Sequence, residues 1–175
     1  MLRFTMRVGD NMTDDKQRID IAKWLFERTI GWIATSDVKV GVAMALDTAM
    51  LGGLAAAFSA SEPHMRTTAC YLAVLVASGG MVIAMFCAGM AAIPRMLGPV
   101  KSMIFFARVA EKKEADYVNE FAQMNEKDFL ADIATQIHRN SQIANEKHMW
   151  VRKSLIWSFL SAIPWIISIG MLVKT

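Results

Sequence analysis

The sequence predicts an all-α integral membrane protein, a helical bundle of three transmembrane helices with a cytoplasmic helical module. Three observations predict this fold class. The chain has 175 residues, of which 54% are hydrophobic and only 20% are charged. The apolar residues gather in three blocks, 40–61, 67–93 and 154–173, and each block meets or approaches the roughly 20 residues that span a hydrocarbon core. The alternation of polar and apolar residues that is typical of strands is not visible in the sequence.

The distribution of Lys and Arg predicts how the chain is oriented. Seven basic residues lie from Arg3 to Lys39 and ten from Arg95 to Lys153, whereas the loop between the first two blocks contains only Arg66. By the positive-inside rule, the N-terminus and the segment between the second and third blocks are cytoplasmic. The predicted segments are a cytoplasmic amphipathic helix (1–38), a transmembrane hairpin (39–94, with spans at about 40–60 and 67–93), a cytoplasmic helical module (95–153), and a third span with a short outside tail (154–175).

The segment before the first span is expected to be helical. Ile19, Ala22, Phe26 and Ile30 recur at helical spacing. The segment either lies on the membrane surface or extends the first span into the cytoplasm. We favour the extension, because no proline or glycine cluster interrupts residues 16–37.

The second and third spans are bounded by residues that begin or end helices. Pro94, Gly98 and Pro99 end the second span, and residues 102–124 are expected to form one short helix. Asn125, followed three residues later by Asp128, is similar to a helix-capping sequence. From Glu126 to Leu172 the only strong helix breaker is Pro164, so one long helix is expected to run from the cytoplasm through the membrane.

Small residues recur every four positions in the first two spans. Such rows allow close approach of helix backbones in lipid, within one chain or between copies of it. They favour a compact bundle or a homo-oligomer. The rows consist of Gly41, Ala45, Ala49, Gly53 and Ala57 in the first span, and of Gly80, Ala84 and Ala88 in the second.

Asp47 lies close to the centre of the first apolar block, where an ionised carboxylate costs about 2.5–3.5 kcal/mol. On a helix, Asp47 lies opposite the row of small residues. Two interpretations remain: a neutral acid that is hydrogen-bonded to a serine such as Ser78, Ser158 or Ser161, or a group that faces the interior of an oligomer. We favour a ring of Asp47 side chains lining a cation path. Asp37 and Lys39 flank the mouth of this span and are further gating candidates.

Enzyme, metal-site and nucleic-acid functions are not expected. The sequence contains no nucleophile with a matching base, no phosphate-binding glycine loop and no paired carboxylates. His64, His138 and His148 lack the spacing of metal ligands. The net charge of +3 is better explained by membrane topology than by nucleic-acid binding.

Three blocks of residues resemble a known family. The first is WI-x3-D-x-K at the entry to the first span, the second is IFF-x2-VA after the second span, and the third is QI-x9-K-x2-W-x-R before the third span. In order, spacing and chain length they resemble the transmembrane effectors of Pycsar, a bacterial antiphage system, which are called PycTM. The blocks comprise Trp32, Ile33, Asp37 and Lys39, then Ile104 to Ala110, then Gln136, Ile137, Lys147, Trp150 and Arg152.

The resemblance implies a specific function. In such systems a partner cyclase makes cyclic CMP or cyclic UMP on infection, and the membrane effector responds by damaging the inner membrane, so that the infected cell dies before phage is released. No other cofactor is implied. A polar stripe before the third span offers a cation for the phosphate, amides for the base and an apolar surface for the ring. The candidate ligand residues are Gln136, Arg139, Asn140, Lys147 and Trp150.

Two other functions remain open on the sequence alone. The chain could be a small constitutive channel or a pore-forming toxin without a nucleotide sensor. It could also be a membrane anchor whose cytoplasmic helices recruit a protein partner.

Overall fold

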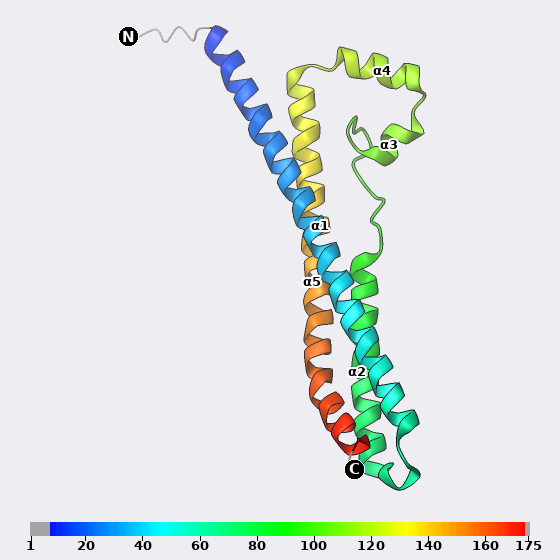
Figure 1. The fold of residues 1–175 in the computed structure, drawn as a ribbon. Helices are drawn as coiled ribbons and strands as arrows, with labels where there is room; N and C mark the ends of the chain where they lie inside the picture. Colours follow the sequence, from blue (N-terminus) through cyan, green and yellow to red (C-terminus); the bar gives the residue numbers. More distant parts are fainter. Residues whose placement is uncertain (1–7, 174–175) are drawn as a thin grey trace, which may run out of the picture. The chain divides into compact units, whose positions relative to one another are not determined.

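The structure consists of helices joined by short connections. The computed structural model describes the backbone of residues 8–173 and the side chains of residues 16–173. No strand occurs in this part of the chain, which confirms the all-α fold class. The predicted positions of Arg3, Arg7 and the outside tail at 174–175 lie outside the described residues. The elements, shown in Figure 1, are α1 (Val8–Ala60), η1 (Pro63–Met65), α2 (Thr68–Ala92), α3 (Phe106–Glu111), α4 (Glu114–Gln123) and α5 (Glu126–Leu172).

Among the described residues, three helices, α1, α2 and α5, are long and apolar enough to cross a membrane. The described residues of α1 continue from before the first apolar block to its end without a break. The expected helical extension of the first span is therefore confirmed, and its cytoplasmic location stays a prediction. The long helix expected from Glu126 to Leu172 is also present, with Pro164 inside it.

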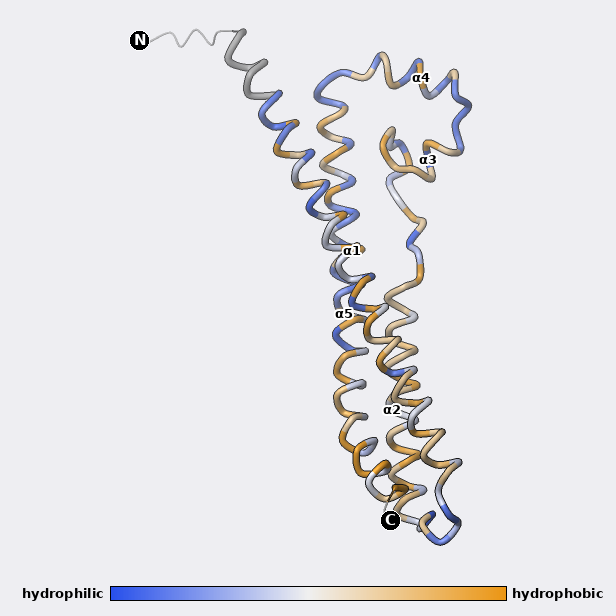
Figure 2. The backbone as a smooth tube through the Cα atoms, viewed as in Figure 1, coloured by the Kyte–Doolittle hydropathy of each residue, from blue (hydrophilic) through white to orange (hydrophobic). Residues whose placement is uncertain are grey.

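The chain divides into two compact units. The membrane unit comprises Ala34–Ile93 and Asn145–Thr175, and it holds the three apolar blocks. The polar unit comprises Met1–Ile33 and Pro94–Ala144. Figure 2 shows the contrast in composition, with hydrophobic residues dominating α2 and the C-terminal parts of α1 and α5.

The membrane unit exposes apolar side chains and buries small and polar ones. Phe159 is 74% exposed and Leu75 is 67% exposed, whereas Asp47 and Ser168 are completely buried. Lipid tails solvate apolar side chains as well as a protein core does, so helices in a bilayer associate through close packing and hydrogen bonds. The exposed apolar surface is consistent with a bilayer around this unit.

The buried positions of α1 and α5 in the membrane unit follow a heptad pattern. Steps of three and four residues alternate along both helices, which is the spacing of helices that pack side by side over a long distance. Four of the seven buried positions on the part of α5 in this unit carry a hydroxyl group. The buried residues are Ser36, Val40, Ala43, Asp47 and Leu54 on α1, and Lys147, Val151, Ser154, Ser158, Ser161, Ser168 and Leu172 on α5.

The loop between α1 and α2 is closed by Arg66. Its guanidinium donates hydrogen bonds to the carbonyl oxygens of Phe58 (3.0 Å) and Ser61 (2.7 Å) and lies over the Phe58 ring, 4.8 Å from its centroid. Carbonyls at a helix C-terminus lack partners within the helix and attract cations. The one basic residue of the short loop therefore caps α1, while Thr67 caps the start of α2 by accepting from the Cys70 amide.

In the polar unit, three side chains on one face of α5 hold the segment 97–105. Asp132 accepts a hydrogen bond from the Met103 amide (2.7 Å), Gln136 donates to the Ser102 hydroxyl (2.8 Å), and Arg139 donates to the Leu97 carbonyl (2.8 Å). These residues are four and three positions apart, which places them along one stripe of the helix. The connection after α2 is thereby fixed to α5.

The expectation of one helix over residues 102–124 is wrong. Two short helices, α3 and α4, are separated at Lys112 and Lys113, whose backbones are extended. Helices this short are marginal alone, so tertiary contacts decide where they end. Here the break lets Lys112 pair with Glu120 and reach the Met103 sulfur (3.0 Å), and Tyr117 donates to the Met103 carbonyl (3.1 Å).

The expected cap of the last helix is present. The Asn125 side chain accepts a hydrogen bond from the Asp128 amide (2.9 Å) and donates one to the Asp128 carboxylate (2.7 Å). The exchange differs from a standard capping box, in which the carboxylate accepts from the backbone amide of the cap residue.

Candidate functional site

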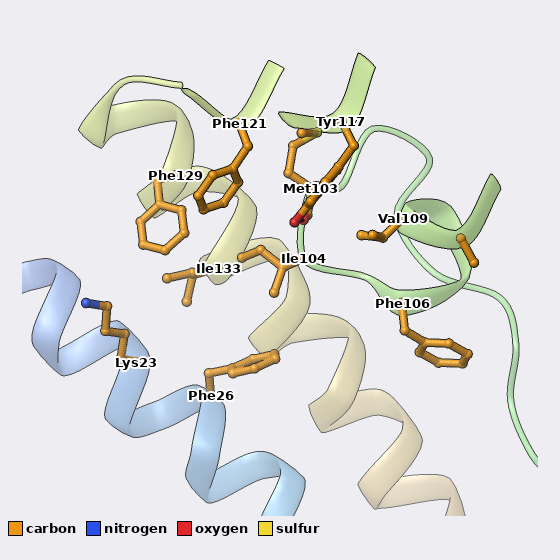
Figure 3. A pocket seen from close by; sticks show the side chains of 11 residues that line it. Lys23, Phe26, Met103, Ile104, Phe106, Val109, Tyr117, Phe121, Phe129 and Ile133 are labelled. Carbon is orange, nitrogen blue, oxygen red and sulfur yellow. Dashed lines mark hydrogen bonds between the residues drawn. The ribbon is translucent and has the colours of Figure 1, made fainter. Parts of the chain in front are cut away.

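A cavity of about 630 Å³ in the polar unit is the main candidate for a ligand site. Figure 3 shows side chains from separate parts of this unit gathered around it. Its lining is largely apolar and rich in aromatic rings. The lining residues are Lys23 and Phe26 of α1, Met103 and Ile104 of the segment after α2, Phe106, Val109 and Ala110 of α3, Tyr117 and Phe121 of α4, and Phe129 and Ile133 of α5.

The break between α3 and α4 shapes this cavity. The fold-back lets Tyr117 reach the Met103 carbonyl, and it brings Phe121 of α4 to the same cavity as Phe106 of α3. Phe121 is 48% exposed, so its ring remains accessible to a ligand. In Figure 3, Phe121 and Phe129 lie on one side of Ile104 and Met103, and Phe106 lies on the other.

Lys23 is the cation of the lining. Its side chain and that of Phe26 rise from α1 at the edge of the cavity in Figure 3. A flat ring binds well against exposed aromatic faces, and an ammonium group stabilises a phosphate through a charge-assisted hydrogen bond. The cavity therefore combines groups for an aromatic base with one group for an anion.

The residues of the predicted ligand stripe are divided between the two units. Gln136, Arg139 and Asn140 belong to the polar unit, whereas Lys147 and Trp150 belong to the membrane unit. Gln136 and Arg139 hold the segment 97–105 through the hydrogen bonds described above. Asn140 is half-buried.

Lys147 and Trp150 also have partners within the chain. Lys147 is 6% exposed and forms an ion pair with Asp37. Trp150 packs beside Val40 and Ala88 and carries the Lys153 ammonium 4.3 Å from its ring centroid. A ligand role for the stripe stays a prediction, but it would require these contacts to open.

The three pore and gating candidates take different positions in the membrane unit. Asp37 is bound to Lys147, and Lys39 is exposed and borders a second, smaller cavity. Asp47 is fully buried between helices of one chain, where it accepts a hydrogen bond from the Ser158 hydroxyl (2.9 Å). This contact is the one described by the first of the two interpretations that the sequence left open, in which a serine is hydrogen-bonded to the acid.

The row of small residues on α1 is not a packing surface within the chain, apart from its last member. Gly41, Ala45, Ala49 and Gly53 are exposed, whereas Ala57 is half-buried. The opposite face of α1, which carries Asp47, is the one that packs inward. The physical reason is that a polar group such as the Asp47 carboxyl is more stable when it is buried between helices than when it is exposed to lipid, whereas small apolar residues are tolerated in lipid.

The row on α2 is a packing surface within the chain. Gly80, Ala84 and Ala88 are buried. A Cβ atom at Gly80 would lie 2.1 Å from the Ser161 hydroxyl oxygen, which shows how closely α2 approaches α5. For this row, the predicted close packing of helices therefore occurs within the chain.

Sequence reasoning did not find the cavity. Its lining residues come from positions 23 to 133 and meet only after the segment following α2 folds back on α5. One signal was available: residues 102–133 contain five of the aromatic side chains in a segment expected to be cytoplasmic, and exposed aromatic residues often mark binding surfaces.

Comparison with known protein families agrees with the resemblance. A family model described as the Pycsar effector protein domain (PycTM) matches residues 21–174. Comparisons with curated proteins and with solved structures gave no match. The family consists of effectors rather than catalysts. Because the match includes nearly all of the described residues of both units, the chain belongs to the PycTM family and is a membrane effector of a Pycsar antiphage system.

Proposed function

We propose that a cyclic pyrimidine nucleotide, cyclic CMP or cyclic UMP, activates this effector, which then impairs the bacterial inner membrane and causes abortive infection. A partner cyclase supplies the nucleotide. The observation that carries the proposal is the family match, which extends over a membrane unit and over a polar unit with an aromatic cavity. The constitutive pore and the protein-recruiting anchor are less well supported, because neither accounts for such a cavity.

We place the nucleotide in the cavity of the polar unit. A charged ligand that is made in the cytosol reaches a polar, cytoplasmic unit more readily than a site within lipid. The aromatic rings Phe121 and Phe129 offer faces for the pyrimidine, and Lys23 offers a cation for the cyclic phosphate. Stacking of a base on an aromatic ring contributes about 1–3 kcal/mol, and a charge-assisted hydrogen bond contributes about 1.5–3 kcal/mol.

Nucleotide binding by the purified full chain tests this placement. Lys23→Ala and Phe121→Ala should each weaken binding of cyclic CMP or cyclic UMP by about 10- to 100-fold. Lys16→Ala is the matched control, because Lys16 is an exposed lysine of α1 that does not line the cavity.

Variants of the stripe on α5 separate the two candidate sites. Arg139→Ala and Lys147→Ala should change nucleotide binding little if the cavity is the site. Binding that is lost in these two variants and kept in Lys23→Ala and Phe121→Ala would move the site to the stripe.

A homo-oligomer is part of the proposal, with the exposed small residues of α1 as the contact between copies. Cross-linking through Ala49→Cys tests it, because the chain's own Cys70 and Cys87 are buried and should react slowly. We expect disulfide-linked dimers from Ala49→Cys in membranes. A cysteine at exposed Leu75 of α2 is the control, and equal cross-linking at both positions would contradict a specific contact on α1.

A further inference from the structure

A second cavity, of about 310 Å³, lies in the membrane unit between α1 and α5. Its lining has two parts of different chemistry. One part is polar and cationic, and the other consists of aliphatic and aromatic side chains. The lining residues are Ser36 and Lys39 of α1, with His148, Val151, Arg152, Leu155, Ile156 and Phe159 of α5.

The cavity lies at the level where the apolar blocks begin. Lys39 directly precedes the first block, and Arg152 lies two residues before the third. Nearby, the Lys153 ammonium lies over the Trp150 ring, an arrangement typical of residues at the membrane–water interface. From Arg152 to Phe159 the helix rises by about 10 Å, so the cavity extends from the headgroup level into the acyl chains.

The charges at this cavity favour an anion. No acidic side chain lines it. The nearby Asp37 is engaged with Lys147, and the described residues include no ion-pair partner for Lys39 or Arg152. His148 contacts Ser36 through its Nδ1 atom at 2.8 Å. Two cationic side chains thus face the same cavity without an acidic partner in the part of the chain that the structure describes.

We propose that this cavity binds an anionic phospholipid of the bilayer. Lys39 and Arg152 hold the phosphate and the headgroup, and one acyl chain lies along Leu155, Ile156 and Phe159. The exposed fractions of Phe159 (74%) and Ile156 (46%) leave apolar surface for that chain. Basic pockets at helix ends on the cytoplasmic side are suited to acidic headgroups. A soluble nucleotide shares the phosphate chemistry but has no acyl chain to lie along these three residues.

Lipid retention by the full-length protein tests the proposal. The protein is purified from bilayers that contain equal amounts of phosphatidylglycerol and phosphatidylcholine, and bound lipid is counted by native mass spectrometry. The wild type should retain phosphatidylglycerol in preference. In the double variant Lys39→Gln, Arg152→Gln, the preference for phosphatidylglycerol over phosphatidylcholine should fall about 30-fold, because each cation contributes to anionic-lipid binding. Lys101→Gln, Lys127→Gln removes the same charge from exposed residues of the polar unit and should change nothing.

Two further arms identify the ligand. Phe159→Ala should weaken retention of phosphatidylglycerol, whereas an excess of glycerophosphate should not displace it. Displacement by this soluble phosphate would show that the site binds free phosphates and would overturn the proposal. Equal retention of both lipids by the wild type, or an unchanged preference in the double variant, would also overturn it. None of these outcomes depends on nucleotide activation, so the proposed function is tested separately.

Discussion

At the scale of single residues, Asp47 illustrates how a carboxyl group is accommodated within a span. Its side chain is completely buried, and Ser158 donates a hydrogen bond to one of its oxygens. The other oxygen, and the hydroxyl of nearby Ser154, have no hydrogen-bond partner among the described residues. Neither α2 nor residues 154–172 of α5 contain Lys, Arg or His. Asp47 is therefore stabilised by a hydrogen bond from a serine hydroxyl and not by an ion pair.

We expect Ser158→Ala to lower the free energy of unfolding by about 0.5–2 kcal/mol, the range for a hydrogen bond between helices in a membrane. Ser78→Ala is the matched control, because the Ser78 hydroxyl donates only to carbonyls of its own helix, and it should cost less. Unfolding in mixed micelles measures both. Equal losses in the two variants would contradict a stabilising contact between Ser158 and Asp47.

Asp47→Asn tests charge without removing the hydrogen-bond acceptor. The buried position favours a structural role, so we expect the variant to leak ions like the parent on activation, with assembly unchanged. The measurement is ion flux from proteoliposomes. A change in flux of ten-fold or more, at equal assembly, would support the ring of Asp47 side chains instead and contradict the structural role.

At the scale of elements, hydropathy and helix breakers predict where the long helices lie. Pro94 and Pro99 end the second span, and the uninterrupted stretch from Glu126 predicts α5. Hydropathy does not determine which face of a span packs inward, because lipid and protein interior are equally apolar. The sequence therefore left open whether the row Gly41, Ala45 and Ala49 packs within the chain or between copies of it, and within the chain the row is exposed. Helix geometry alone predicts that Asp47 lies on the face of α1 opposite this row, and this arrangement is observed.

The cavity of the polar unit could be predicted only in part. The block that contains Ile104 and Phe106 was recognised in the sequence, and both residues line the cavity. The contribution of α1 and the break before α4 depend on contacts between distant segments, such as Tyr117 with Met103. The periodicity of apolar residues indicates local secondary structure only, so it could not predict these contacts.

The close approach of α2 to α5 gives a prediction for a pair of adjacent glycines. Gly80→Ala should destabilise the protein by about 1–3 kcal/mol, because the new methyl group would overlap the Ser161 side chain. Gly79→Ala is the matched control, since no atom lies within 4 Å of a Cβ at Gly79. Thermal unfolding in micelles measures the difference. Similar midpoints for the two variants would contradict the packing.

At the scale of the whole molecule, topology determines which unit meets the cytosol. The excess of Lys and Arg predicts that the N-terminus and residues 95–153 are cytoplasmic. The single basic residue of the short loop, Arg66, is engaged in capping α1. We expect a phosphatase fusion near residue 120 to be inactive and one placed in the loop near residue 63 to be active. Strong activity near residue 120 would reverse the topology and place the aromatic cavity outside the cell.

The central claim is that a nucleotide bound in the polar unit makes the membrane leak. The most direct test is the membrane potential of proteoliposomes that contain the full chain, recorded while cyclic CMP or cyclic UMP is added. We predict that the potential collapses on addition of a cyclic pyrimidine nucleotide with the wild type and with Lys16→Ala, and that Lys23→Ala requires about 10- to 100-fold more nucleotide. A potential that never responds to nucleotide, or that collapses equally without it, would contradict the account.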